Sequence, residues 1–232
     1  MDLKWNPYKR NAVVIPAILI LLPFAVLHYY YLDSKIHNIE HVFDVLKTLS
    51  RVALPLAFLL LVTSTARLIG KGYFEKRYFK DSLHMPTTTF LLHSDETLSK
   101  VYKQKIRARI KEMFAIRLLS ATEETADELE ARRTIVDAVG YIRNKVKDGY
   151  MLLKYNIFYG FWRNLVGGSV IGLFICLINC FIFWRIQFQI EALWLTAIMA
   201  IAYIALLASS KWATGALGRM YARRLYEEFM SL

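Results

Sequence analysis

The sequence predicts an all-α membrane protein with four transmembrane helices and a helical cytoplasmic domain inserted between the second and third spans. Four stretches lack Asp, Glu, Lys and Arg, at residues 11–32, 52–66, 164–184 and 192–210, and the second continues past Arg67 to Gly70. About 20 apolar residues allow a helix to cross the hydrocarbon core of a bilayer. The composition agrees, because 56% of the 232 residues are hydrophobic. We therefore place the spans at 12–32, 52–70, 164–184 and 192–210.

The net charge of +11 predicts the orientation of these spans. Lys and Arg gather in the tail 1–11, at both ends of the segment 71–163 and in the tail 211–232. The loops 33–51 and 185–191 are poorer in them. Because cytoplasmic segments carry the excess of Lys and Arg, we expect both termini and the 71–163 domain in the cytoplasm. The same rule explains the basic balance without nucleic acid as a partner.

The inserted segment 71–163 shows mainly helical signals. Residues 72–83 can continue the second span, whereas 84–93 contain Pro86 and predict a turn with an extended stretch. Apolar residues recur at helical spacing over 96–117. Ser120 and Glu123 form a capping-box pattern that starts a further helix, expected to end near Gly149. That helix is expected to bury Ala126, Leu129, Val136, Val139 and Val146. The aromatic-rich segment 150–162 then predicts a helix at the membrane interface.

The sequence His37-Asn-Ile-Glu40-His41 matches the His-x-x-Glu-His pattern of some zinc peptidases. A loop of about 19 residues leaves no room for a further ligand and a substrate cleft. We interpret the motif as a short amphipathic surface helix, and a metalloenzyme using it is the second alternative function. No phosphate-binding glycine loop, cysteine zinc spacing or Gly-x-Ser-x-Gly elbow occurs in the domain, so we expect no enzymatic activity and no cofactor.

Six cations lie close together in the predicted helix 96–117. Such a face could bind the phosphates of a nucleotide-like ligand, an RNA or anionic lipid. Pairing with the acidic residues of 123–130, or proximity to a negative leaflet, is the other explanation. We predict a ligand- or partner-binding surface made of Lys100, Lys103, Lys105, Arg107, Arg109 and Lys111.

Small residues follow one another along the third and fourth spans. Gly168 and Gly172 form a Gly-x-x-x-Gly pattern, which Cys176 and the polar Asn179 extend. Small residues allow helices to approach closely in lipid. Ala205 and Ser209 form a similar row in the fourth span. Packing within one bundle and packing between subunits both explain these rows, and we expect a homo-oligomer through the two spans. The spans contain no Asp, Glu or Lys, which argues against an ion-coupled transporter.

Two segments carry a resemblance to a known family. The run 85–92, with Asp95 and Lys105, resembles the start of a cytoplasmic domain in an uncharacterised bacterial membrane-protein family. The run 154–167 resembles that family's Asn-x-x-Tyr-Gly-Phe-x-Arg-Asn-Leu signature, from which this chain departs where Lys154-Tyr155 precede the asparagine. The resemblance covers roughly residues 75–170. The shared positions, which we expect to form a coupling network at the membrane face, are Thr87, Thr88, Asn156, Tyr159, Arg163 and Asn164.

The family has no assigned activity, and its layout is similar to that of small membrane effectors of bacterial phage defence. The resemblance implies a multi-pass protein of the bacterial inner membrane. We hypothesise an antiviral-defence effector whose cytoplasmic domain receives a protein partner or an anionic ligand, and whose oligomeric bundle perturbs the membrane or forms a pore. The alternative is a passive membrane scaffold that recruits a cytoplasmic enzyme.

Overall fold

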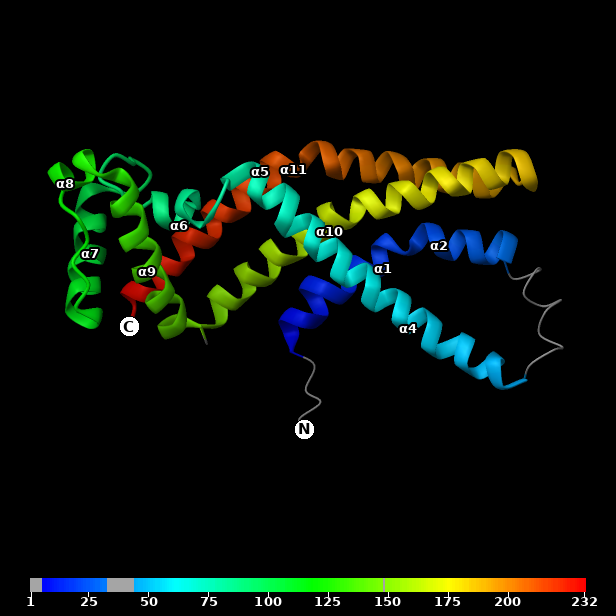
Figure 1. Ribbon diagram of the computed structural model, residues 1–232, viewed down its shortest axis with the longest axis horizontal. Helices are drawn as coiled ribbons and strands as arrows, with labels where there is room; N and C mark the ends of the chain where they lie inside the picture. The colour runs from blue at the N-terminus through cyan, green and yellow to red at the C-terminus, as the bar shows by residue number, and fades with distance from the viewer. Residues whose placement is uncertain (1–5, 33–43, 148) are drawn as a thin grey trace. The chain divides into compact units, whose positions relative to one another are not determined.

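The computed structural model describes residues 6–32, 44–147 and 149–232, and these ranges are helical, with no strand among them (Figure 1). Three helical segments are long and apolar enough to cross a membrane: Lys9–Leu32, Tyr150–Ile186 and Ile190–Met230. They contain three of the four predicted spans, so the all-α class and the presence of long apolar helices are confirmed. The predicted span 52–70 lies almost wholly in α4 (Asp44–Ile69), whose side chains are described only from residue 56. A fourth span remains a prediction.

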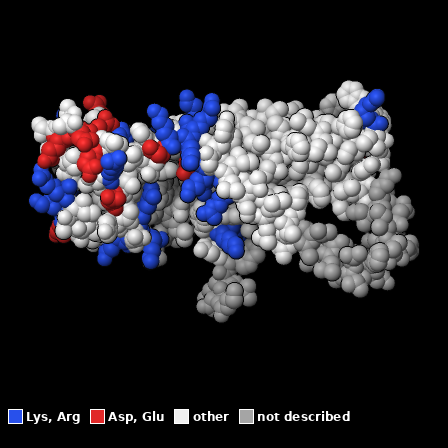
Figure 2. All heavy atoms as spheres, viewed as in Figure 1, with Lys and Arg blue, Asp and Glu red and all other residues white. Residues whose placement is uncertain are grey.

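The chain divides into two compact units. We call Met1–Phe74 with Gly160–Trp212 the apolar unit, and Glu75–Tyr159 with Ala213–Leu232 the polar unit. Helices α10 (Tyr150–Phe181) and α11 (Ile190–Met230) contribute residues to both. In Figure 2 the helices of the apolar unit present a surface almost free of charge, whereas both signs of charge are mixed over α7 to α9.

The first apolar helix is interrupted in the apolar unit. It consists of η1 (Lys9–Val14), α1 (Ile15–Ile20), α2 (Leu22–Leu27) and η2 (His28–Leu32), with wide π-helical turns at both ends. Pro16 and Pro23 each stand in the first turn of an α-helical piece. Proline lacks an N–H and cannot continue the i to i−4 ladder, which explains why the helix breaks at these positions.

Helices α4, α10 and α11 complete the apolar unit, together with η5 (Ile182–Ile186). One buried cluster joins the first helix, α4 and α10 through Ala17, Ile20, Val62, Ala66 and Leu165. A second joins the end of the first helix to the turn between α10 and α11 through Leu27, Phe183 and Ala192. The residues of both clusters are apolar.

The polar unit contains most of the short helices. They are α5 (Lys76–Phe79), η4 (Ser82–His84), α6 (Pro86–Thr89), α7 (Lys100–Phe114), α8 (Ala121–Ala126) and α9 (Glu128–Val146), preceded by η3 (Gly70–Glu75). The residues 84–93 differ from the expected extended stretch, because Pro86 starts a helical turn at its first position. The predicted capping box is confirmed: Ser120 and Glu123 bond each other's backbone amides at the start of α8.

The core of the polar unit differs from the expectation in two respects. Residues 213–232, expected as part of a basic tail, form the end of α11 and bury Ala222, Leu225, Tyr226 and Phe229 against α7 and α9. Their spacing of three and four residues gives this helix an apolar face. On α9 the buried face starts at Ala131, and Leu129 is 49% exposed. Ala126 is also exposed, because α8 ends there and α9 begins in a new direction.

Candidate functional site: a carbonyl seam in the apolar unit

Side chains of α10 and α11 bind the carbonyls that the two prolines deprive of a helical donor. Pro16 offers no N–H to the Ala12 carbonyl four residues earlier, and the Asn164 side-chain amide donates to that oxygen at 2.6 Å. Pro23 offers none to the Leu19 carbonyl, and the Tyr203 hydroxyl donates to it at 2.8 Å. The hydrocarbon core of a bilayer has no water to satisfy such groups, and in this structure neighbouring helices supply the donors.

Two further carbonyls of the first helix accept side-chain bonds. The Asn179 amide donates to the Pro23 oxygen at 2.7 Å, and the Gln187 amide donates to the Tyr30 oxygen at 3.2 Å. The four acceptors are residues 12, 19, 23 and 30, whose separations of 7, 4 and 7 correspond to whole turns of a helix. We call these four carbonyls and their four donors the carbonyl seam.

The seam is long and neutral, and three of its four donors are buried, whereas Gln187 is half-buried. Eighteen residues separate Ala12 from Tyr30, which at about 1.5 Å per residue is about 27 Å and close to the thickness of a bilayer core. Asn164 and Asn179 are 2% and 0% exposed, and Tyr203 is 5% exposed. In Figure 1, α2 runs beside the second half of α10, in agreement with the bond between Asn179 and Pro23. The arrangement is a row of four separate amide or hydroxyl contacts, spaced one to two helical turns apart, between helices that are mainly apolar.

The predicted packing residues serve contacts within one chain. A Cβ at Gly172 would lie 2.7 Å from Cζ of Tyr203, and one at Gly168 would overlap the Ile20 side chain. Cys176 is fully buried and Asn179 belongs to the seam. By contrast, Ala205 is exposed on α11, and Ser209 bonds the Leu206 carbonyl of its own helix at 3.0 Å. The glycines therefore bring α10 against the first helix and α11, and oligomerisation remains a prediction.

The predicted coupling residues are divided between the two units, with Arg163 and Asn164 in the apolar unit and the other four in the polar unit. In the polar unit, Thr87 accepts from Arg143 at 3.3 Å and from the Tyr226 hydroxyl through its carbonyl, while the Thr88 hydroxyl donates to the Ser82 carbonyl at 2.9 Å. Tyr159 donates to Glu75 at 2.9 Å. Asn164 belongs to the carbonyl seam. Asn156 is half-buried on α10, as is Arg163.

Two of the six predicted ligand-binding cations are structural. The Lys103 ammonium belongs to a side chain that is 5% exposed, and it donates to the Leu92 carbonyl at 2.6 Å and to the Asp95 carbonyl. The Arg107 guanidinium donates to the Leu91 carbonyl at 2.7 Å and to the Leu119 carbonyl. Burial lowers the pKa of both groups. Lys103 and Arg107 therefore do not belong to the predicted ligand-binding surface. The spacing of cations along a helix does not indicate which of them a loop will cover.

Glu124 fixes the other side of the same loop. Its carboxylate, 4% exposed, accepts from the backbone amides of His93 at 2.8 Å and Ser94 at 3.0 Å. The loop 91–95 is thus held by two cations at its carbonyls and one anion at its amides. We call this set the loop clamp: Lys103, Arg107 and Glu124. A conformational signal that reaches this loop would have to break charge-assisted bonds.

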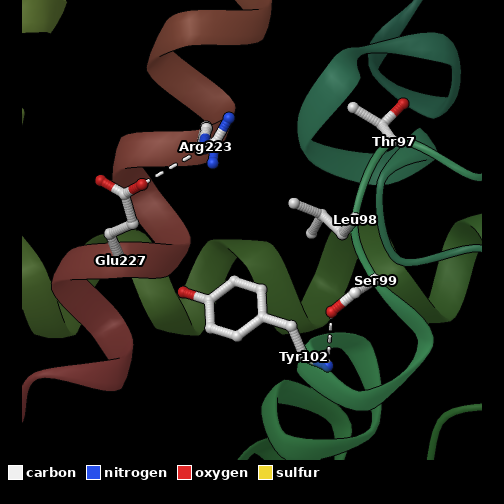
Figure 3. A pocket seen from close by; sticks show the side chains of 6 residues that line it. All are labelled: Thr97, Leu98, Ser99, Tyr102, Arg223 and Glu227. Atoms are coloured by element: carbon white, nitrogen blue, oxygen red, sulfur yellow. Dashed lines mark hydrogen bonds and ion pairs between the residues drawn. The ribbon is translucent and has the colours of Figure 1, made fainter.

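Three of the other four cations of the predicted set remain available at the surface, whereas the Arg109 guanidinium donates to the Met230 carbonyl at 3.5 Å. Lys100, Lys105 and Lys111 are exposed, and Arg109 lies half-buried with its guanidinium over the Phe229 ring, 5.9 Å from its centroid. Near the start of α7 is an open pocket of about 500 Å³. Figure 3 shows its walls: the hydroxyl-bearing Thr97, Ser99 and Tyr102 on one side, and Arg223 with Glu227 on the other. Arg223 and Glu227 pair at 3.3 Å, so an anionic ligand would compete with Glu227.

The motif formed by His37, Glu40 and His41 lies outside the described residues. Sequence reasoning missed Tyr203 and Gln187, and it considered Glu124 only as one of the acidic residues of 123–130 that could pair with the cations. A usable signal existed for one of them: every proline inside a membrane helix leaves a carbonyl four residues earlier, and a buried polar residue on a neighbouring span is its natural donor.

No protein-family model, curated protein or solved structure matches this chain. The resemblance drawn from residues 85–92 and 154–167 therefore remains a prediction.

Proposed function

We propose that the protein is a non-enzymatic membrane effector whose helical bundle opens along the carbonyl seam and permeabilises the membrane. The observation that carries the proposal is the seam itself, about 27 Å of neutral polar groups between the first helix and its neighbours. A bundle held together only by apolar side chains would expose only apolar surface to water on opening, which is unfavourable. Here, carbonyls, amides and a hydroxyl would replace their mutual bonds with bonds to water.

The two proline breaks support motion of the first helix. Its backbone bonds are already interrupted at Pro16 and Pro23, so tilting one piece against the next breaks few of them. The closed state is then held by a small number of side-chain bonds, each worth about 1 kcal/mol in membrane proteins. A two-state bundle biased by such amounts responds to modest ligand or partner contacts.

The polar unit is the proposed receiver of the signal in the cytoplasm of a bacterial cell. The exposed cations Lys100, Lys105 and Lys111, together with the pocket beside Tyr102, offer contacts for a protein partner or an anionic ligand. Because α11 supplies both Tyr203 of the seam and Arg223 of the pocket, one helix carries residues of both sites. We also propose that the protein has four spans, that its bundle is oligomeric and that it acts in phage defence.

The test is dye release from liposomes that contain the purified full-length protein. We expect release from wild type and faster release from Tyr203→Phe, since the Leu19 carbonyl then gains a partner only when water enters. The control is Thr63→Val on α4, where the lost hydroxyl bonds the Leu60 carbonyl of its own helix at 2.8 Å. Tight liposomes for every variant, with a cytoplasmic protein co-purifying, would favour the passive scaffold.

A further inference from the structure

Buried side-chain oxygens in the apolar unit include some that have no hydrogen-bond partner within the described part of the chain. They are Oδ1 of Asn164, Oδ1 of Asn179 and Oγ1 of Thr196. Asn179 on α10 and Thr196 on α11 are both 0% exposed. An unsatisfied polar atom at such a depth costs free energy, so its retention calls for a partner that is not a protein group.

The register of α10 and α11 places Asn179 and Thr196 at the same level along the helix pair. Gly172 of α10 lies against Tyr203 of α11, and Phe183 shares a buried cluster with Ala192. In an antiparallel pair, each step forward on one helix matches a step backward on the other. Asn179 follows Gly172 by seven residues, and Thr196 precedes Tyr203 by seven. The same match holds from the other end, four residues from Phe183 and four from Ala192.

Thr196 also behaves differently from other helical hydroxyls of the apolar unit. Ser169 bonds the Leu165 carbonyl at 2.8 Å, Thr63 bonds the Leu60 carbonyl at 2.8 Å, and Ser209 bonds that of Leu206. Such bonds to the preceding turn are the usual way a helical hydroxyl is satisfied in lipid. The Thr196 hydroxyl makes no such bond among the described residues, although the same kind of carbonyl lies one turn away.

We infer that a water molecule binds between Asn179 and Thr196. It donates to Oδ1 of Asn179 and bonds the Thr196 hydroxyl, while the Asn179 amide holds the Pro23 carbonyl at 2.7 Å. About two to four polar partners are what a buried water requires. A neutral site with two free oxygens suits water better than a cation such as Ca²⁺, which takes about six or more oxygen ligands. We also expect water to enter the seam first at this site. That role rests on the proposed function, whereas the binding of the water molecule does not.

The test replaces the hydroxyl without changing the side-chain volume. Thr196→Val removes the water's partner, and we expect the thermal midpoint of the full-length protein in mild detergent to fall by about 2–4 °C. Thr196→Ser should stay near wild type. The double variant Asn179→Leu with Thr196→Val should lose less than the sum of the single variants, because either change alone releases the water. Ser169→Ala, which removes a hydroxyl bonded to its own helix, is the control and should combine additively with Asn179→Leu.

A midpoint that rises in Thr196→Val would overturn the inference, since removing a dry orphan hydroxyl stabilises a core. A wild-type midpoint that increases with NaCl but not with choline chloride, and only while Thr196 is present, would assign the site to a cation instead and also overturn it. Water-edited solid-state NMR provides a direct reading, with early transfer from water expected at Asn179 and Thr196. Dye release is scored separately, so loss of the water site with leakage intact refutes only this inference.

Discussion

The hydroxyl of Tyr203 on α11 donates to the carbonyl of Leu19, 2.8 Å away, which is the carbonyl that Pro23 leaves without a helical donor. A residue 184 positions later in the chain therefore completes the backbone bonding of the first helix. The relationship ties a sequence feature, a proline in an apolar stretch, to a tertiary contact. Its strength can be measured by restoring the missing N–H.

Tyr203→Phe should destabilise the full-length protein by about 0.6–2 kcal/mol, measured by denaturant titration in mild detergent. In a Pro23→Ala background the same change should cost less, because the alanine introduced there supplies an N–H to the Leu19 carbonyl. Equal costs in both backgrounds would show that the Tyr203 bond does not replace the missing helical one.

Asn164→Leu should behave in the same way toward Pro16→Ala, since its amide binds the Ala12 carbonyl. The expected coupling between the two changes is about 0.5–1.5 kcal/mol in a double-mutant cycle. Asn179→Leu with Pro23→Ala provides the matched control. Asn179 binds the oxygen of residue 23 itself, which either residue offers, so these two changes should be additive.

Gly172→Ala should destabilise the bundle, because its Cβ would lie 2.7 Å from Cζ of Tyr203 and displace the ring. Displacement also breaks the bond to Leu19, so adding Tyr203→Phe should cost little more. Gly140→Ala on α9 is the opposite case: nothing lies within 4 Å of its Cβ. There, we expect stabilisation by about 0.5–1 kcal/mol from the better helix propensity of alanine. Loss of stability at both positions would count against the packing role of Gly172.

Lys103→Met should loosen the polar unit by about 1–3 kcal/mol, because the Leu92 and Asp95 carbonyls lose their donor. Faster hydrogen exchange at residues 91–95 and in the first turns of α7 would report it. Lys105→Met, an exposed position on the same helix, should leave exchange unchanged. Similar exchange in both variants would remove Lys103 from the loop clamp.

The same lysine gives a pH dependence of known sign. Burial lowers the pKa of Lys103 below its ordinary value of 10.5, so the unfolded chain holds this proton more tightly than the folded one. The contribution of the group to stability therefore rises as pH increases from the folded pKa toward 10.5. Lys103→Met should remove this rise, and denaturant titrations of both proteins between about pH 8 and 10 would measure the difference.

The sequence determined the elements of this protein whose causes are local. Uncharged runs predict helices at 12–32, 164–184 and 192–210, and the pattern from Ser120 to Glu123 predicts a capped helix start, because hydropathy and capping act within a few residues. The interruption of the first helix follows from Pro16 and Pro23 alone.

Only the tertiary structure decided which distant residues bond to these elements or pack against them. The partners of Ala12 and Leu19 are more than 150 residues away. The prolines indicate that each carbonyl needs a donor, but they do not select Asn164 or Tyr203 as that donor. A face of cations on α7 looked exposed, yet a loop folds over Lys103 and Arg107. The end of the basic tail completes the core of the polar unit through its aromatic residues. Burial and hydrogen bonding depend on what the rest of the chain brings alongside a residue, and that is a property of the packed fold.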